Sequence, residues 1–292
     1  MHEAGELHLR VAKSIPAGHL EAAVEEGRRT GDGDEWLRTG PVKIFGDGAL
    51  GSHTCHMSEP FAGEPGNTGI EVTAPPELER LIARASGAGI AVATHAIGDR
   101  ANALVVGAHH RTRELWHGRL RHRIEHAQHL RDETITQMAA LGLVASMQPV
   151  HVAGDLDLVT SLLPDPRLRS FAWRSMLDAG VPLAFGSDAP VATPDPFLGM
   201  VAALTRARQD GTPAGGWQPE QRLTRAEALA AYTAGSAYAM GEPWRGGVLA
   251  PGRFADLVVV DRDILGDSVE SLRGTRVLTT VVGGLVRWSR GD

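Results

Sequence analysis

The sequence predicts an α/β fold built on a parallel sheet. Short apolar runs alternate with helix-like stretches from the amino terminus to about Pro243. Strands that alternate with helices of about 10–15 residues are typical of parallel β/α units whose strands are buried on both faces. Such units form either a doubly wound sheet or a closed barrel, and the alternation alone leaves both architectures open. The 292 residues are enough for one large barrel or for two ordinary domains.

Six segments have the apolar character and the length of strands. They are residues 7–15, 41–48, 90–99, 121–128, 143–151 and 182–190. Helical patterns lie between them, at residues 75–89, 99–116, 132–142 and 166–180. Two prolines begin the first of these helices and two glycines end it, which is the usual distribution of these residues at helix ends.

The carboxyl-terminal part of the chain is organised differently. An amphipathic helix is expected over residues 223–240, and two β-rich stretches follow at 246–263 and 275–288. No helix separates these stretches, and Gly283-Gly284 interrupts the second one as a hairpin turn does. We therefore expect a β/α body over residues 1–243 and a small antiparallel β element over residues 244–292.

Composition and charge exclude several classes of protein. The net charge of −6 is spread along the chain, and no basic run indicates nucleic-acid binding. No run of about 18 apolar residues predicts a membrane span, and the amino terminus lacks the apolar core of a signal peptide. The single Cys55 excludes an intramolecular disulfide and suits a reducing compartment. We expect a cytoplasmic protein that acts on a small molecule, with no nucleic-acid or membrane partner.

Four of the predicted strands end in an ionisable residue beside small or turn-forming residues. These residues are Lys43, His95, His126 and Asp188. In a β/α barrel the carboxyl ends of the strands form the floor of the active site. An ionisable side chain that an apolar strand places there is costly unless it is paired or bound to a metal.

Two histidines, an aspartate and a modified lysine form a plausible ligand set for zinc or a similar divalent ion. An ammonium group has no free electron pair, so Lys43 must be neutral or carry a carboxylate added by carbon dioxide to serve as a ligand. Taken singly, each histidine fits a hydrogen-bonded structural role, Lys43 fits a surface position and Asp188 fits a turn. Their occurrence in order on successive strands favours the metal site.

Other histidines carry weaker signals. His109 and His117 are expected on a solvated helix face, whereas His122 and His129 flank a strand and are expected at the surface. His151 ends the strand predicted at 143–151 and is a candidate to reach the same opening as the four strand-end residues.

The sequence resembles the amidohydrolase superfamily, and specifically its amidohydrolase-3 branch of YtcJ-like and N-substituted formamide deformylase-like enzymes. The matching segments begin with VKIFGDGALGSHT (42–54) and PGNTG (65–69). They continue with THAIGDRAN (94–102), RHRIEHAQ (121–128), ASMQPVH (145–151), GSDAPV (186–191) and GGVLAPGRFADLVVVD (246–261). The resemblance covers nearly the whole chain from about Leu7 onward.

This resemblance implies a TIM-type (β/α)₈ barrel that hydrolyses carbon–nitrogen bonds of amides, formamides or cyclic amides by means of metal-activated water. It implies a centre with one or two divalent ions, most simply Zn²⁺. Lys43, carbamylated by carbon dioxide, would bridge the metals, and His95 and His126 would bind one of them. Asp188 would bind the other metal and act as the general base. The final β-rich segments would belong to a β-sandwich. Asp47, Gly48, His151 and Arg206 are candidates to contact the substrate.

One family feature is missing from the sequence. The family carries a His-x-His pair on its first barrel strand, and none of the 13 histidines forms such a pair. The segment at 7–15 resembles the third strand of the family, so we expect about six of eight β/α units. The strands on either side of the missing units would have unpaired edges, which would favour aggregation, a homo-oligomer or a complementing chain.

Two functional hypotheses follow from this departure. The first is a metal-dependent carbon–nitrogen hydrolase. The alternative is a truncated, non-catalytic remnant, or a subunit that needs a complementing amino-terminal segment. A doubly wound nucleotide-binding protein is rejected because no glycine-rich phosphate loop follows the first strand, and the loop at 46–53 does not lead into a helix.

Overall fold

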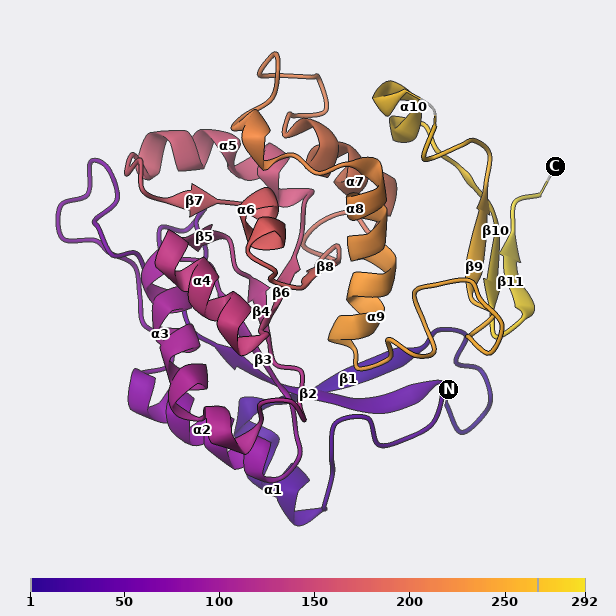
Figure 1. The fold of residues 1–292 in the computed structure, drawn as a ribbon, viewed down its shortest axis with the longest axis horizontal. Coiled ribbons are helices and arrows are strands. Elements are labelled where there is room, and N and C mark those ends of the chain that lie inside the picture. The colour runs from indigo at the N-terminus through magenta and orange to yellow at the C-terminus, as the bar shows by residue number, and fades with distance from the viewer. Residues whose placement is uncertain (1, 267, 292) are drawn as a thin grey trace.

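The computed structural model describes residues 2–266 and 268–291 and contains the expected parallel sheet (Figure 1). Within these residues, six strands pair in the order β1-β2-β3-β4-β6-β8, and each neighbouring pair is parallel. The strands are β1 (Val11–Pro16), β2 (Leu37–Phe45), β3 (Val92–Ala96), β4 (Arg123–His126), β6 (Val144–Met147) and β8 (Leu183–Phe185). Each overlaps one of the predicted strand segments, so the α/β prediction is confirmed.

The sheet has two ends in the part of the chain that the structure describes. β1 and β8 are its outermost strands and do not pair with each other, so its pairing does not close a barrel. A helical segment covers the β8 end, where the Ser236 hydroxyl donates to the carbonyl of Phe185 at 2.8 Å. A Cβ at Gly235 would overlap the carbonyl oxygen of Leu183, so glycine permits this close approach. Covering an edge in this way keeps it from pairing with another chain.

The two faces of the sheet differ. Ile44, Thr94 and Ile124 point to one face, where they are buried. On the other face the strand register aligns Phe45, His95 and Glu125. Phe45 is 51% exposed. The expectation that the strands are buried on both faces is therefore wrong at β2, because the described chain leaves this face partly open.

Four helices connect the first strands, and all but the first of them correspond to predicted helices. They are α1 (Leu20–Glu25), α2 (Pro75–Gly87), α3 (Asp99–Arg111) and α4 (Asp132–Leu141). Gly142 ends α4 in the left-handed conformation, with φ of 69°, which is a common way to end a helix. α2 and α3 both pack on β3 and on each other, and Figure 1 shows α2, α3 and α4 together along one side of the sheet.

The later helices agree less well with prediction. They are α5 (His151–Leu162), α6 (Trp173–Asp178), α7 (Pro196–Thr205), α8 (Arg225–Ala230), α9 (Ser236–Ala239) and α10 (Val269–Arg273). The helix predicted at 166–180 forms only as α6. Its first part is instead β7 (Arg169–Ser170), which pairs with β5 (His129–Leu130).

The helix predicted at 223–240 is formed by α8, a π-helical turn (Ala231–Gly235) and α9. At its start, Thr224 and Glu227 form a reciprocal capping box. None of the helices in residues 2–266 and 268–291 combines the length and apolarity that a membrane crossing requires.

A separate antiparallel sheet follows α9. It consists of β9 (Leu257–Val260), β10 (Val277–Val282) and β11 (Leu285–Ser289). The predicted hairpin is confirmed, because Gly283 and Gly284 connect β10 to β11 and both have positive φ. Figure 1 shows this sheet beyond α9 and apart from the parallel sheet. The expected domain boundary after Pro243 lies in the segment between α9 and β9 and stays a prediction.

Three histidines that were expected on solvated surfaces are buried. His109, His122 and His129 are 0% exposed. The ring of His109 packs 5.6 Å from that of Trp116 and 4.9 Å from that of His122. The backbone N–H of Val92 donates to Nδ1 of His122 at 2.8 Å. Neither ring nitrogen of His109 has a hydrogen-bond partner within the described residues. The expectation failed because of tertiary packing: α2 packs on α3, which carries His109, and the pairing of β5 with β7 brings Ser170 against His129.

Arg206 is also buried, which contradicts its expected place in a substrate opening. It follows α7 with φ of 51° and is 0% exposed. Its guanidinium donates to the carbonyls of Trp217, Phe171 and Ser170 at 2.8, 2.7 and 3.1 Å. It also lies over the rings of Trp173 and Trp217. Arg206 therefore ties three segments of the core together.

Acid should destabilise the fold through the His109–His122 pair. Burial lowers the pKa of His109 to about 3 and that of His122 well below its ordinary value. In the unfolded chain these groups protonate near pH 6.5. Their contribution to stability is therefore complete above about pH 6.5 and is lost as the pH falls toward 3.

Urea unfolding at pH 7 and pH 4 tests this expectation. His109→Phe keeps an aromatic ring and removes the titration, so it should lose roughly 3 kcal/mol less stability than wild type over this interval. His110→Phe, at the exposed neighbouring position, is the matched control and should behave as wild type. Equal losses for His109→Phe and wild type would contradict the assignment.

Replacement of Arg206 should affect stability. Arg206→Met leaves three buried carbonyls without their donor, and we expect the free energy of unfolding to fall by about 3 kcal/mol. Arg113→Met, at an exposed position, should change it by less than about 0.5 kcal/mol. Chemical denaturation of the three proteins measures both effects, and a stable Arg206→Met protein would show that the buried network is dispensable.

Candidate metal centre

Two of the four predicted ligands meet at the ends of neighbouring strands. His95 lies on β3, and His126 is the last residue of β4. In the strand register His126 pairs with Ala96, whose side chain is buried on the helix-covered face. His126, however, has φ of 74°, which ends the regular strand. Its ring lies edge-on to that of His95, with ring centroids 4.7 Å apart.

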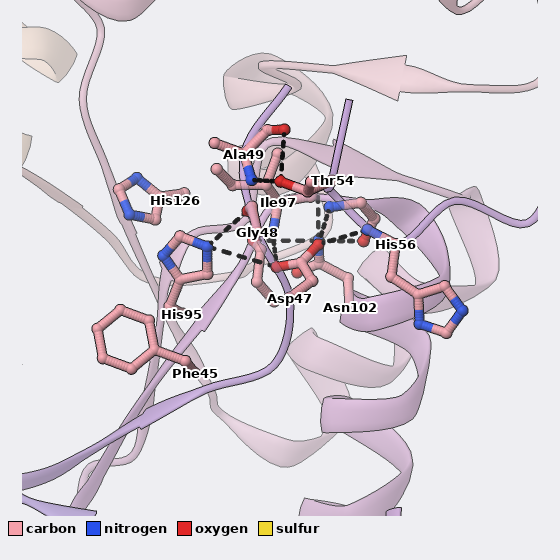
Figure 2. Close-up of polar contacts among 12 residues, drawn as sticks. Phe45, Asp47, Gly48, Ala49, Thr54, His56, His95, Ile97, Asn102 and His126 are labelled. Atoms are coloured by element: carbon pink, nitrogen blue, oxygen red, sulfur yellow. Dashed lines mark hydrogen bonds and ion pairs between the residues drawn. The ribbon is translucent and has the colours of Figure 1, made fainter. Parts of the chain in front are cut away.

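Each of the two rings has one nitrogen engaged by a hydrogen-bond acceptor. Nε2 of His95 lies 2.9 Å from the carbonyl oxygen of Gly48, and Nδ1 of His126 lies 2.8 Å from Oε1 of Gln148. Figure 2 shows the engaged nitrogen of His95 directed at the Gly48 loop and its other nitrogen directed away from it. The second nitrogen of each ring remains available as an electron-pair donor.

Both imidazoles are neutral at neutral pH, as metal ligation requires. Burial and, to a smaller extent, the neighbouring His126 together lower the pKa of His95 to about 4. Burial and the charge of Lys43 likewise lower the pKa of His126 to about 4, against the hydrogen bond to Gln148, which raises it. The chemistry of this pair therefore fits a divalent cation of the zinc type.

Lys43 is half-buried on the same face of the sheet. Its Nζ lies 4.9 Å from the centroid of the Phe45 ring. Burial lowers the pKa of Lys43, and the charge of Glu125 opposes this effect. Arg123 donates to Glu125 at 2.6 Å. Burial raises the pKa of Glu125, but Arg123 and a hydrogen bond from Ser146 outweigh it and leave the pKa lowered.

Asp188 lies after β8 and acts through its charge on Lys43 and His95. It follows the strand by three residues, is exposed and has φ of 58°. Its negative charge raises the pKa values of Lys43, His95 and His151 against the effect of burial. A positive φ at a non-glycine residue costs of order 1–3 kcal/mol and often marks a functional position.

The arrangement does not amount to a complete ligand shell. Among residues 2–266 and 268–291, no three His, Cys, Asp or Glu side chains are close enough to hold a metal ion together. The residues therefore fit a metal through the His95–His126 pair, with Lys43 and Asp188 nearby.

Asp47 and Gly48 adjoin His95 but build the loop that supports it. The Asp47 carboxylate accepts the backbone N–H groups of His56, Ile97 and Gly98 at 2.9, 3.0 and 2.8 Å (Figure 2). Burial raises the pKa of Asp47 to about 6, against the lowering effect of these bonds. At 2% exposure Asp47 does not line an opening, contrary to expectation.

His151 reaches the centre by another route than predicted. The strand expected to end at His151 ends at Met147, and His151 begins α5. Its ring nevertheless stacks on that of His126, with centroids 6.1 Å apart. Gln148 and Glu125 were not singled out as site residues. Glu125 pairs with His95 in the strand register, so it can be recognised as a neighbour of the site once the pairing of the strands is known.

Comparison with known proteins supports the assignment made from the sequence motifs. The profile of the amidohydrolase family, in its amidohydrolase-3 branch, matches residues 1–287. The chain is 36% identical over 253 residues to the protein LONG AFTER FAR-RED 3 of Arabidopsis thaliana. It is 33% identical to the Bacillus subtilis protein YtcJ, which is named as an amidohydrolase. It is also 33% identical to the N-substituted formamide deformylase of Arthrobacter pascens.

These alignments cover most of this chain but only part of each relative. The alignment with LONG AFTER FAR-RED 3 covers 86% of this chain and 43% of that protein. The alignment with YtcJ covers 87% of this chain and 48% of YtcJ. The alignment with the deformylase covers 87% of this chain and 46% of the deformylase. The chain thus spans less than half the length of each of these relatives.

A solved structure agrees with the fold. The crystal structure of an uncharacterized metal-dependent hydrolase from Pyrococcus furiosus superposes with a TM-score of 0.78 at 30% identity. The superposition covers 90% of this chain and 53% of the other. The profile match over nearly the whole length, the relatives and this superposition agree with one another. The chain belongs to the amidohydrolase family of hydrolases.

Proposed function

We propose that this chain forms part of a divalent-metal centre that hydrolyses carbon–nitrogen bonds other than peptide bonds. The observation that carries the proposal is the His95–His126 pair. Two neutral imidazoles from adjacent strands lie edge to face, and each has one nitrogen engaged by an acceptor and one free. Neutral imidazole with a hydrogen-bonded second nitrogen is a common metal ligand.

Lys43 and Asp188 supply the remaining predicted groups. Burial favours the neutral amine of Lys43, which can add carbon dioxide and release a proton to become an anionic carbamate ligand. A bound divalent ion supplies Lewis-acid chemistry, because it polarises a carbonyl and makes water more acidic. Asp188 takes a proton from the attacking water and returns it to the leaving nitrogen. Zn²⁺ suits the nitrogen and oxygen donors.

The substrate class that we propose is an amide, a formamide or a cyclic amide. The deformylase relative acts on N-substituted formamides by name, and this class is the first to test. Gly48 and His151 remain candidates for substrate contact, and His151 lies beside His126 and within the field of Asp188. The buried, unpaired Cys55 is consistent with the cytoplasmic location that we propose.

A second candidate is a subunit that becomes active only with ligands from another segment. It is favoured by the finding that no three His, Cys, Asp or Glu side chains of the described residues converge on one metal position. Such a segment would be part of the same polypeptide or of a partner. Reading the coding sequence around this one for an apolar strand that ends in His-x-His tests whether such a segment belongs to the same polypeptide, whereas hydrolysis by the purified chain alone would contradict the second candidate.

Metal content is the direct test of the centre. After incubation with zinc and bicarbonate, we expect the purified protein to retain about one equivalent of metal. His95→Ala and His126→Ala should each reduce this content strongly, because each removes one of few ligands. The exposed His117→Ala should not. Elemental analysis gives the result, and less than about 0.2 equivalents in wild type would contradict the proposal.

The role of Asp188 is tested by hydrolysis of an N-substituted formamide. Asp188→Asn removes the proton acceptor, so we expect the rate to fall by about 100-fold or more. Asp178→Asn, an exposed change on α6, should leave the rate unchanged. If Asp188→Asn retained full activity, Asp188 would not be the base. If wild type bound metal but showed no hydrolysis, the second candidate would be favoured.

A further inference from the structure

Gln148 lies directly after β6 and contacts one of the two central histidines. Only 7% of Gln148 is exposed, so its amide has little access to water. Its Oε1 lies 2.8 Å from Nδ1 of His126, and its Nε2 donates to the backbone carbonyl of Ser146 at 3.4 Å. Both ends of the amide are therefore engaged inside the protein.

These two contacts determine which way the amide faces. The Ser146 carbonyl can only accept a hydrogen bond, so it faces the NH₂ end of the Gln148 amide. The Oε1 end is then left for His126. Reversing the amide would place an oxygen against the Ser146 carbonyl oxygen, and two acceptors would repel each other.

The orientation of the amide in turn determines the tautomer of His126. An oxygen at Nδ1 requires that Nδ1 carry the proton, and the neutral ring then has its electron pair on Nε2. The contacts from Ser146 through Gln148 to His126 thus leave one free electron pair, on Nε2 of His126. The Gly48 carbonyl acts in the same way on Nε2 of His95 and leaves the pair on Nδ1.

We propose that Gln148 is a positioning residue that holds His126 in the Nδ1-protonated tautomer and so presents its Nε2 electron pair beside His95. The effect on metal rests on the proposed function, whereas the tautomer is a property of the metal-free protein. A group in this position raises the fraction of protein that is ready to bind. Loss of such an outer contact typically lowers metal affinity 10- to 100-fold.

The tautomer can be measured directly in metal-free protein labelled with ¹⁵N-histidine. The nitrogen spectrum distinguishes protonated from unprotonated ring nitrogens, and the spectrum of a His126→Gln variant assigns the signals. We expect Nδ1 of His126 to be protonated in wild type and in Gln148→Glu, which keeps an acceptor. We expect a mixture of tautomers in Gln148→Met, which removes it. Unchanged tautomers in Gln148→Met would overturn the proposal.

Metal affinity provides the second readout. Competition with a chelator should show Zn²⁺ bound 10- to 100-fold more weakly by Gln148→Met than by wild type. Gln148→Glu should bind within a few-fold of wild type. Gln137→Met, at an exposed position on α4, is the matched control and should bind as wild type. Equal affinity in Gln148→Met and wild type would overturn the positioning role in metal binding.

The two readouts separate the possible failures. If wild type binds no zinc while its His126 is Nδ1-protonated and Gln148→Met loses this preference, the tautomer assignment stands and the proposed function fails. If wild type binds zinc but His126 is protonated at Nε2 before binding, the proposed function stands and Gln148 does not play this role. Thermal unfolding of each variant shows whether a lower affinity reflects lost fold.

Discussion

The parallel pairing of β3 with β4 is the interaction on which the candidate centre depends. It aligns His95 with Glu125 and brings the end of β4 beside His95. The left-handed backbone at His126, which costs of order 1–3 kcal/mol, then ends the strand where the two rings meet. A shift of one residue in this register would move every side chain of β4 to the opposite face and separate the pair.

The polar groups around the histidines show how the fold supports such a site. Burial of imidazole rings is favourable only when their nitrogens are hydrogen-bonded or bound to metal. At the centre one nitrogen of each ring is engaged by an acceptor, supplied by the Gly48 carbonyl or by Gln148. Asp47 holds the Gly48 loop through backbone N–H groups. His109 differs, because its two nitrogens find no partner in the described chain.

The open face of the sheet relates this chain to its longer relatives. Phe45 is half exposed beside His95, and β1 and β8 are the two ends of the sheet. The chain aligns with less than half of each curated relative. The metal-dependent hydrolase from Pyrococcus furiosus is also longer, since 53% of it is covered. The partial ligand shell and the partly open face occur on the same side of the sheet.

The sequence by itself determined the family, the succession of strands and helices, and the histidines at the strand ends. Apolar periodicity and helix-end residues are local signals, so β3, β4, α2 and α4 lie close to their predicted positions. Only the tertiary structure decided which side chains are buried and what they contact. Arg206 and Asp47 were predicted as site residues, but segments distant in sequence enclose them. The pairing of β4 with β6 brings His126 beside Gln148. The sequence alone does not reveal this contact, because hydrogen-bond partners depend on distance in space.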